Sequence, residues 1–172
     1  MADLGFNRSA PADTVSDLSG FKTRIHREGR VYIGGQPDHD ALCALAERGA
    51  TAVINLRTPK EMEDSTKVAF DEAALVDSLG LEYVWVPLGG KDHPYTPAAV
   101  DTFAAALDRN PGPVLVHCTL AGRASHLWAA YLVRYHGFSV TEAYERGVVT
   151  GIGITPLAKM VDKTLTLVEA GP

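Results

Sequence analysis

The residues best suited to chemistry lie in one short stretch, from Val114 to Ser125. An apolar run ends there at His117 and Cys118, and Arg123 follows where a helix-like segment begins. A thiol at that point faces the backbone N–H groups of the coming helix, and those groups, the helix dipole and Arg123 all favour an anion. The same surroundings favour the thiolate form of Cys118, which is the nucleophilic form. The stretch therefore predicts a cysteine nucleophile beside an oxyanion site.

The loop that would hold the oxyanion consists of Thr119, Leu120, Ala121 and Gly122. Loop amides closed by an arginine suit the oxygens of a phosphate, because the guanidinium of Arg123 offers a bidentate fork. The hydroxyl groups of Thr119 and Ser125 are candidates to stabilise the thiolate or to position water. For Ser125, a hydrogen bond to the backbone of the first helical turn is the alternative. We predict that these loop residues and Ser125 bind the substrate.

Strands alternating with helices must position this stretch. We expect strands near 21–26, 30–33, 51–56, 81–86 and 114–117. We expect helices near 38–48, 60–79, 97–108, 122–135, 139–147 and 155–168. This order predicts an α/β fold with a mainly parallel central sheet flanked by helices. Ligands in such sheets bind at the carboxyl ends of the strands, where Cys118, Arg57 and the loop after Val86 would lie.

Composition limits the possible partners. The chain has 172 residues, 46% of them hydrophobic, which is enough for one core over residues 21–172, with 1–20 expected as a flexible leader. A net charge of −5 gives no support for nucleic acid or an anionic membrane as partner. The sequence contains no run of 18 apolar residues, so we expect no segment that spans a bilayer. The leader lacks an apolar signal region, which favours a cytoplasmic protein; a secreted or periplasmic mature form is the alternative. Two cysteines and scattered histidines predict no metal, and we expect no cofactor.

Four other residues are expected to have structural or peripheral roles. Cys43 lies in an apolar helical stretch and is expected to be a small buried hydrophobe. Trp85 and Trp128 stand at strand and helix spacing, so core packing explains them better than recognition. Gln36 lies in a turn and is expected to contribute to the rim of a substrate site at most.

The spacing of His117, Cys118 and Arg123 resembles the signature of the cysteine-dependent phosphatases. In that family His-Cys is followed by five residues, an arginine, and then Ser or Thr. The loop is one residue shorter here, so the family's arginine position falls on Ala124. The shorter spacing resembles that of rhodanese-type sulfurtransferases. It also resembles the bacterial phosphatase-like domains of beta-lactamase-hydrolase-like proteins.

Three further blocks resemble that bacterial subgroup: YIGGQP at 32–37, AVINLR at 52–57, and GLEYVWVP at 80–87. From about residue 30 to 135 the chain is thus similar to a bacterial protein tyrosine or dual-specificity phosphatase-like family. The resemblance implies a dual-specificity-like architecture. The family's usual glycine, three residues after the cysteine, is Ala121 here, and Gly122 comes one residue later.

The resemblance also implies roles for residues outside the loop. In relatives, an aspartate in the loop after the strand that precedes the catalytic one protonates the leaving oxygen. Asp92 lies in the corresponding loop and is the candidate general acid, with His93 as the fallback. His117 would orient the loop through hydrogen bonds. Arg57 either senses the substrate or pairs with Glu61, and a structural ion pair is the favoured interpretation.

Three functions stay open at this point. The favoured one is a phosphatase that acts on a phosphorylated protein or a small phosphate ester through a cysteinyl-phosphate at Cys118. It would need no metal, because the loop amides and Arg123 supply the positive field. The short loop also suits a sulfurtransferase that carries a persulfide on Cys118. Ala121 and Ala124, at the family's glycine and arginine positions, suit a catalytically weak phosphate-binding pseudophosphatase.

Overall fold

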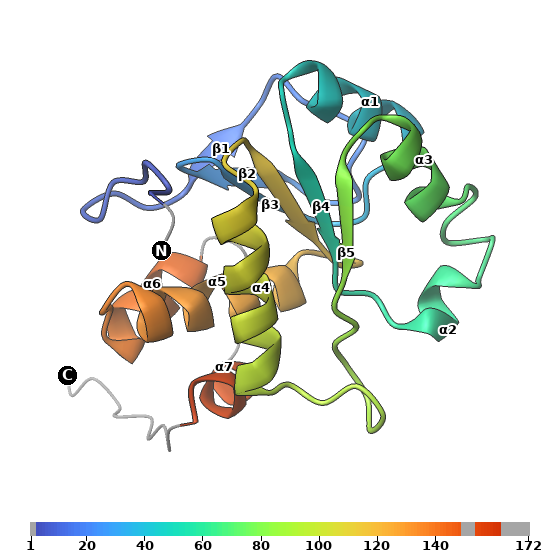
Figure 1. The fold of residues 1–172 in the computed structure, drawn as a ribbon. Helices are drawn as coiled ribbons and strands as arrows, with labels where there is room; N and C mark the ends of the chain where they lie inside the picture. Colours follow the sequence, from blue (N-terminus) through green and yellow to red (C-terminus); the bar gives the residue numbers. More distant parts are fainter. Residues whose placement is uncertain (1–2, 149–153, 163–172) are drawn as a thin grey trace.

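The computed structural model describes residues 3–148 and 154–162, and within them a six-stranded sheet lies at the centre (Figure 1). The strands are β1 (Asp13–Val15), β2 (Ile25–Glu28), β3 (Val31–Gly34), β4 (Ala52–Asn55), β5 (Glu82–Trp85) and β6 (Val114–His117), in the spatial order β1-β2-β3-β6-β4-β5. The first three strands pair antiparallel, and β3, β6, β4 and β5 pair parallel. The prediction of a mainly parallel sheet is confirmed.

Helices cover both faces of the sheet. They are α1 (His39–Glu47), α2 (Pro59–Met62), α3 (Glu72–Ser78), α4 (Pro97–Arg109), α5 (Gly122–Tyr135), α6 (Val140–Val148) and α7 (Ile154–Val161). The core on one face includes side chains of α1 and α3, and the core on the other includes side chains of α4, α5, α6 and α7 (Figure 1). The part of the last predicted helix beyond residue 162 lies outside the described residues.

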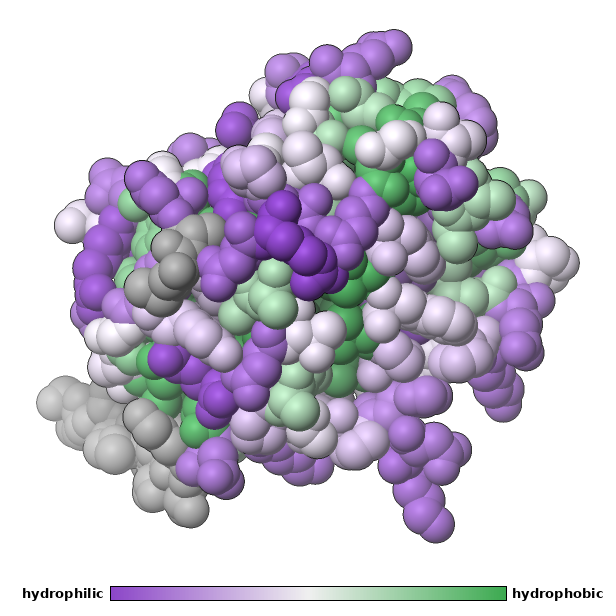
Figure 2. Space-filling view, in the orientation of Figure 1, coloured by the Kyte–Doolittle hydropathy of each residue, from purple (hydrophilic) through white to green (hydrophobic). Residues whose placement is uncertain are grey.

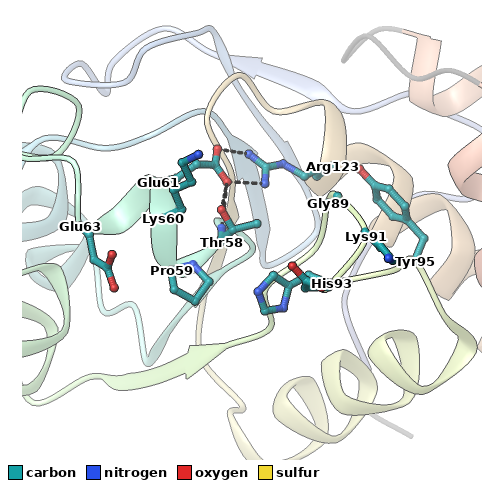
Figure 3. Close-up of a pocket in the computed structure, with 12 residues that line it drawn as sticks. Thr58, Pro59, Lys60, Glu61, Glu63, Gly89, Lys91, His93, Tyr95 and Arg123 are labelled. Atoms are coloured by element: carbon teal, nitrogen blue, oxygen red, sulfur yellow. Dashed lines mark hydrogen bonds and ion pairs between the residues drawn. The ribbon is translucent and has the colours of Figure 1, made fainter.

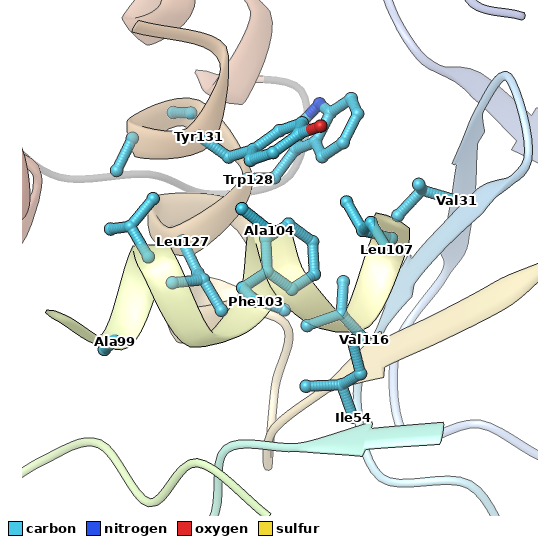
Figure 4. Packing of buried hydrophobic residues seen from close by; sticks show 14 of the residues in the cluster. Val31, Ile54, Ala99, Phe103, Ala104, Leu107, Val116, Leu127, Trp128 and Tyr131 are labelled. Carbon is cyan, nitrogen blue, oxygen red and sulfur yellow. The ribbon is translucent and has the colours of Figure 1, made fainter. Parts of the chain in front are cut away.

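Alternation along β6 shows how the sheet joins the two cores. Val114 and Val116 face α4 and α5, whereas Leu115 faces α1 and α3, and all three are fully buried. Figure 4 shows Val116 and Leu127 packed around Phe103 of α4. Because both faces are covered, the strand needs apolar residues at every position, which explains its continuous apolar sequence. A strand held in this way is a rigid base for the residues that follow it.

The single helix predicted over 60–79 is wrong in its middle. Residues 63–71 are not helical and separate α2 from α3. Asp64 accepts hydrogen bonds from the backbone N–H and the hydroxyl of Thr66, at 3.1 and 2.5 Å. Asp71 caps the start of α3 by accepting from the N–H of Ala74 at 3.0 Å. Short aspartate side chains that bond the nearby backbone favour turns and caps over helix interiors.

The segment predicted as a flexible leader makes specific contacts. β1 pairs with β2, and Leu4 is 2% exposed. Phe6 lies edge-on to Trp128 with ring centroids 5.8 Å apart, and Arg8 donates to the carbonyl oxygens at 136 and 137. The polar composition of residues 1–20 does not reveal these contacts, in which Leu4 belongs to the core and Phe6 packs against it.

No helix in residues 3–148 or 154–162 is long and apolar enough to cross a bilayer. Figure 2 shows hydrophilic side chains spread over one face, with hydrophobic ones mainly in the recesses between them. In the same residues no cluster of three or more His, Cys, Asp or Glu side chains could hold a metal ion.

Candidate active site

Four parallel strands end in register and so define one functional edge of the sheet. His117 of β6 pairs with Gly34 of β3 and with Asn55 of β4, and Asn55 pairs with Trp85 of β5. The segments that leave the sheet at this edge begin with Gly35, Leu56, Val86 and Cys118. The expected placement of Cys118, Arg57 and the loop after Val86 at the carboxyl ends of strands is confirmed.

The loop from Cys118 to Arg123 is closed by a left-handed residue. Ala121 has φ 70° and ψ −19°, and α5 begins directly after it at Gly122. The carbonyl oxygen of Ala121 accepts from both the N–H and the hydroxyl of Ser125, each at 2.9 Å. The left-handed turn therefore falls at the family's glycine position and not at Gly122. This conformation costs an L-residue about 1 kcal/mol or more, so the backbone of the short loop is strained at Ala121.

The loop residues differ widely in exposure. Cys118 is 2% exposed and belongs to the core beside α4 and α5. Its N–H donates to the carbonyl of Gly34 over a long 3.4 Å. Leu120 is 64% exposed and forms an isolated antiparallel bridge with Gly35. The thiol thus sits at the inner end of a loop whose tip faces solvent.

Arg123 is held by the carboxylate of Glu61, which we predicted from the sequence as a partner of Arg57. Its Nη1 and Nη2 donate to the two carboxylate oxygens of Glu61 at 2.8 and 2.7 Å (Figure 3). Nη1 also donates to the carbonyl of Leu88 at 2.7 Å, and Nη2 donates to the hydroxyl of Thr119 at 3.0 Å. The bidentate fork predicted for an oxyanion is therefore oriented by Glu61 in this structure.

The charges of this pair are mutually stabilised. Burial lowers the pKa of Arg123, but hydrogen bonding to Glu61 and the nearby Cys118 and Glu61 charges outweigh it and raise that pKa above its usual value. Hydrogen bonding to Arg123 lowers the pKa of Glu61 well below its usual range, against the effect of burial. Both side chains are therefore charged at neutral pH.

A cavity of about 750 Å³ opens beside Arg123. Its walls come from the segment around α2, from the loop after β5, and from α5; the lining residues are Thr58, Pro59, Lys60, Glu61, Glu63, Gly89, Gly90, Lys91, Asp92, His93, Tyr95 and Arg123. Figure 3 shows Glu61 and Arg123 meeting above His93. Among the described residues, this lining includes Arg123 but not Cys118.

The loop after β5 brings the candidate acids to this cavity. The N–H of Gly89 donates to the carbonyl of His93 at 2.7 Å, which closes a tight turn with Gly90 at φ 74°. Asp92 lies exposed within this turn, and both Asp92 and His93 line the cavity. The fold therefore places the predicted acid and the predicted oxyanion-binding arginine around one space.

His117 has a buried carboxylate partner that no sequence pattern indicated. Its Nε2 lies 3.0 Å from Oε1 of Glu72, and both side chains are fully buried. Burial would raise the pKa of Glu72, but His117, Gln36 and the hydroxyl of Tyr83 together outweigh burial and lower it. The predicted role of His117 as an anchor of the loop thus has a physical partner in α3.

Arg57 and Gln36 are more deeply placed than expected. Arg57 is fully buried, its Nε lies 3.7 Å from Glu61, and its Nη1 donates to Oε1 of Gln36 at 2.5 Å. Gln36 is 3% exposed, so its predicted position at the rim of a substrate site is wrong. Trp85 is 46% exposed, so its predicted core position is also wrong, and its Nε1 donates to the carbonyl of Arg57 at 2.7 Å. The same prediction for Trp128 is confirmed, because that side chain is 2% exposed.

Cys43, the second cysteine, is only half-buried. Its sulfur lies 3.8 Å from Nδ1 of His39, one helical turn earlier. The expectation of a small buried hydrophobe is therefore wrong, because α1 turns this face partly toward solvent. Cys118 and Cys43 are both free thiols.

Comparison with known proteins agrees with this geometry. Residues 29–133 match the family described as beta-lactamase hydrolase-like protein, phosphatase-like domain. A beta-lactamase hydrolase-like protein of Xylella fastidiosa strain Temecula1 is 37% identical over 100 residues, which are 58% of this chain and 22% of that protein. The chain therefore matches less than a quarter of that relative's length.

Solved structures of phosphatases share the fold. PTPMT1 is 21% identical with a TM-score of 0.66, over 80% of this chain and 92% of that one. TpbA of P. aeruginosa is 19% identical with a TM-score of 0.64, over 91% of this chain and 92% of that one. At these identities the likeness establishes the architecture, and the chemistry must be argued from the site.

Proposed function

Since the chain belongs to the phosphatase-like domain family of beta-lactamase hydrolase-like proteins, we propose that it hydrolyses phosphate monoesters through a cysteinyl-phosphate on Cys118. One observation carries the proposal. Cys118 follows a buried strand and precedes α5, and Arg123 at the start of α5 lines the same cavity as Asp92. The predicted oxyanion-binding arginine and the predicted acid therefore line one cavity, and Cys118 lies at the inner end of the loop that leads to Arg123.

The proposed reaction has two steps. The Cys118 thiolate attacks phosphorus and the ester P–O bond breaks, while Asp92 gives its proton to the leaving oxygen. Loop amides and the guanidinium of Arg123 stabilise the charge on the equatorial oxygens. Water then attacks the cysteinyl-phosphate and gives a proton to the Asp92 carboxylate. The S–P bond breaks, and inorganic phosphate leaves with the thiolate restored.

Supporting residues have separate proposed tasks. Residues 119–122 provide the amides, and Ser125 holds the left-handed turn through its bond to Ala121. Thr119 donates to Oε1 of Glu61 at 2.7 Å and accepts from Arg123, so it ties the loop to the clamped arginine. Gly89 and Gly90 let the turn that carries Asp92 move relative to Arg123 when the ester binds.

Two solved structures with the same fold support the proposed substrate class. TpbA has been crystallised in complex with pTyr, and PTPMT1 in complex with PI(5)P. Both ligands are phosphate monoesters on a six-membered ring. We propose a phosphorylated protein, such as a phosphotyrosine protein, or a small phosphate ester for this chain; the cavity of about 750 Å³ has room for such a ring. We also propose a cytoplasmic location, where free thiols are maintained.

The decisive experiment is hydrolysis of p-nitrophenyl phosphate by the wild type and by Cys118→Ser, with a chelator present. We expect chelator-resistant release of p-nitrophenol that Cys118→Ser abolishes. Asp92→Asn tests the acid: it should lower the rate more for alkyl phosphates, whose alkoxides leave poorly, than for aryl phosphates. Equal losses on both substrates would remove Asp92 from the acid role, and His93→Gln would then be measured in the same way.

Sulfur transfer is a second candidate because of one observation, the four-residue loop between Cys118 and Arg123. A smaller ring of amides suits a sulfane sulfur on Cys118 better than a tetrahedral phosphate. Transfer of sulfur from thiosulfate to cyanide by the wild type, with no release of p-nitrophenol, would favour this candidate. A chain that does neither but binds phosphate would fit the pseudophosphatase alternative.

A further inference from the structure

A chain of buried polar side chains leads away from the nucleophile loop at His117. Nε2 of His117 lies 3.0 Å from Oε1 of Glu72, and Nε2 of Gln36 donates to Oε2 of the same carboxylate at 2.5 Å. The other end of the Gln36 amide accepts from Nη1 of Arg57, also at 2.5 Å. These four residues are between 0 and 3% exposed.

The same chain returns to the loop at its other end. Arg57 donates from Nη2 to the backbone carbonyl of Glu61 at 3.4 Å, and its Nε lies 3.7 Å from the Glu61 carboxylate. That carboxylate holds both Nη atoms of Arg123. Both ends of the loop, His117 before Cys118 and Arg123 after Gly122, are therefore anchored in one connected network.

Charges alternate along this network. Glu72 and Glu61 are anionic, because the pKa of each lies below its usual value, and each lies next to a cationic or hydrogen-bond donating group. Gln36 joins the Glu72 carboxylate to the Arg57 guanidinium with both ends of its amide engaged, which fixes the orientation of the amide. In a dry interior such bonds are strong, and the loss of one partner is costly.

Backbone hydrogen bonds tie the nucleophile loop to both neighbouring strands, and the weakest of them is the one made by Cys118 itself. The N–H of Cys118 donates to Gly34 over 3.4 Å, at the long limit of a hydrogen bond. The carbonyl of His117 accepts from the N–H of Leu56 at 3.0 Å on the β4 side, and the N–H of Gln36 donates to the carbonyl of Thr119 at 3.2 Å on the β3 side. The bond of the His117 side chain to Glu72 adds a buried side-chain constraint directly before Cys118, where the backbone bond is long.

We infer that Glu72 and Gln36 are positioning residues for the nucleophile loop, Glu72 acting through His117 and Gln36 through Glu72 and Arg57. The inference rests on the proposed phosphatase function. Neither residue lines the cavity beside Arg123, so each acts through the chain and not on the substrate. The block YIGGQP thereby gains a physical role: its glutamine joins β3 to the loop after β6.

The test compares Glu72→Gln with a matched control, Glu28→Gln. Glu28 is also a buried carboxylate, 3% exposed, and it accepts from Nε1 of Trp128 at 3.0 Å, away from the strand ends that form the site. We expect Glu72→Gln to lower kcat/KM for p-nitrophenyl phosphate about tenfold, the effect of a modest loss in transition-state stabilisation. Glu28→Gln should leave kcat/KM within about twofold of the wild type.

A double-mutant cycle separates positioning from a general loss of stability. In a His117→Asn background the side chain through which Glu72 reaches the loop is already removed and only its bonds to Gln36 and Tyr83 remain, so Glu72→Gln should lower kcat/KM by much less than about tenfold. A second loss of about tenfold in that background would overturn the inference. Gln36→Leu interrupts the network at its middle and provides the same comparison if Glu72→Gln does not fold.

Affinity for tungstate, measured by calorimetry, gives a readout that needs no turnover. A loop that is already positioned loses less conformational entropy when it binds the anion. Glu72→Gln should therefore raise the tungstate Kd about fivefold or more, while Glu28→Gln does not. If the wild type binds tungstate in this pattern but hydrolyses no ester, the phosphatase proposal fails and the positioning inference stands. If the wild type hydrolyses the ester and Glu72→Gln matches it in both rate and Kd, the inference fails and the phosphatase stands. No tungstate binding by the wild type overturns the inference as well.

Discussion

His126 should make the stability of this protein fall on the acid side of neutrality. It lies one turn into α5, three residues after Arg123, and is 6% exposed. Burial lowers its pKa from 6.5 to about 4. Between these two values the unfolded chain binds a proton that the folded chain excludes, so the free energy of unfolding rises with pH across this window. The protein therefore loses none of its free energy of unfolding through His126 above about pH 6.5, and it loses progressively more as the pH falls toward 4.

The size of the effect follows from the same two values. Each tenfold change in proton affinity is worth about 1.4 kcal/mol, so the full loss below pH 4 is about 3 kcal/mol and the loss at pH 5 is about 2 kcal/mol. A domain of this kind has a free energy of unfolding of about 5–15 kcal/mol, so the change is easily measured. Burial also lowers the pKa values of His26 and His136, which adds to the loss. The raised pKa of buried Glu28 acts in the opposite direction above about pH 4.5.

Urea denaturation near pH 7, 6 and 5 measures this dependence in the wild type and in His126→Gln. We expect the variant to lose about 2 kcal/mol less than the wild type between pH 7 and 5, whatever its stability at pH 7. His39→Gln, at an exposed histidine of α1, should keep the slope of the wild type. Equal slopes for His126→Gln and the wild type would refute the reasoning. The variant also helps to interpret activity. We expect the rate to give a bell-shaped pH profile with its optimum below pH 7. If His126→Gln shifts the acid side of that profile, the fall in rate there reflects unfolding and not catalysis.

Three further predictions concern the loop and its supports. Ala121→Val should lower the free energy of unfolding by about 2 kcal/mol more than Ala121→Gly, because a β-branched residue resists the left-handed conformation; equal urea midpoints would contradict this. Glu61→Gln should cost about 2 kcal/mol near pH 7, and the difference should shrink in titrations below pH 4.5, because the lowered pKa of Glu61 gives stability that is present above 4.5 and lost as the pH falls. Arg30→Lys should cost about 2 kcal/mol by the same assay, because a lysine cannot replace the guanidinium bonds to three carbonyls around the end of α4. The KM of Arg30→Lys for p-nitrophenyl phosphate should not change, since Arg30 precedes β3 and so lies at the end of the strand opposite to the site.

Local signals explain which parts of the fold the sequence predicted well. β6 and α5 were predicted with the bounds that the structure has, because a short apolar run, a proline-rich turn before it and a glycine after it are all local features. Cys118 and Arg123 could be placed for the same reason, since the end of one element and the start of the next fix them. The helix prediction for 63–71 is wrong because the aspartates there hydrogen-bond to nearby residues and form turns. Hydrophobic periodicity carries no information about such bonds.

Residues that depend on tertiary contacts could not be found in this way. Glu72 follows its N-cap Asp71 in the first turn of a short helix, where an acidic residue is ordinary, and only the packing of α3 against the sheet buries it beside His117. Trp85 alternates correctly for a core residue, but β5 is an edge strand and leaves it 46% exposed. Glu61 was paired with Arg57, four residues before it, and the stronger partner Arg123 is 62 positions away.

The register of the parallel strands explains why separate blocks of sequence share one function. The blocks at 32–37, 52–57 and 80–87 each contain the end of a strand, and these ends lie level with His117. Because these ends are aligned, the next residues of each block meet at one edge: Gln36 and Arg57 form the buried support, and Leu88, just past the third block, holds Arg123. A shift of one strand by a single residue would turn its side chains to the other face and break this support. The spacing within each block is thus tied to the sheet as much as to chemistry, and the nucleophile loop depends on all three.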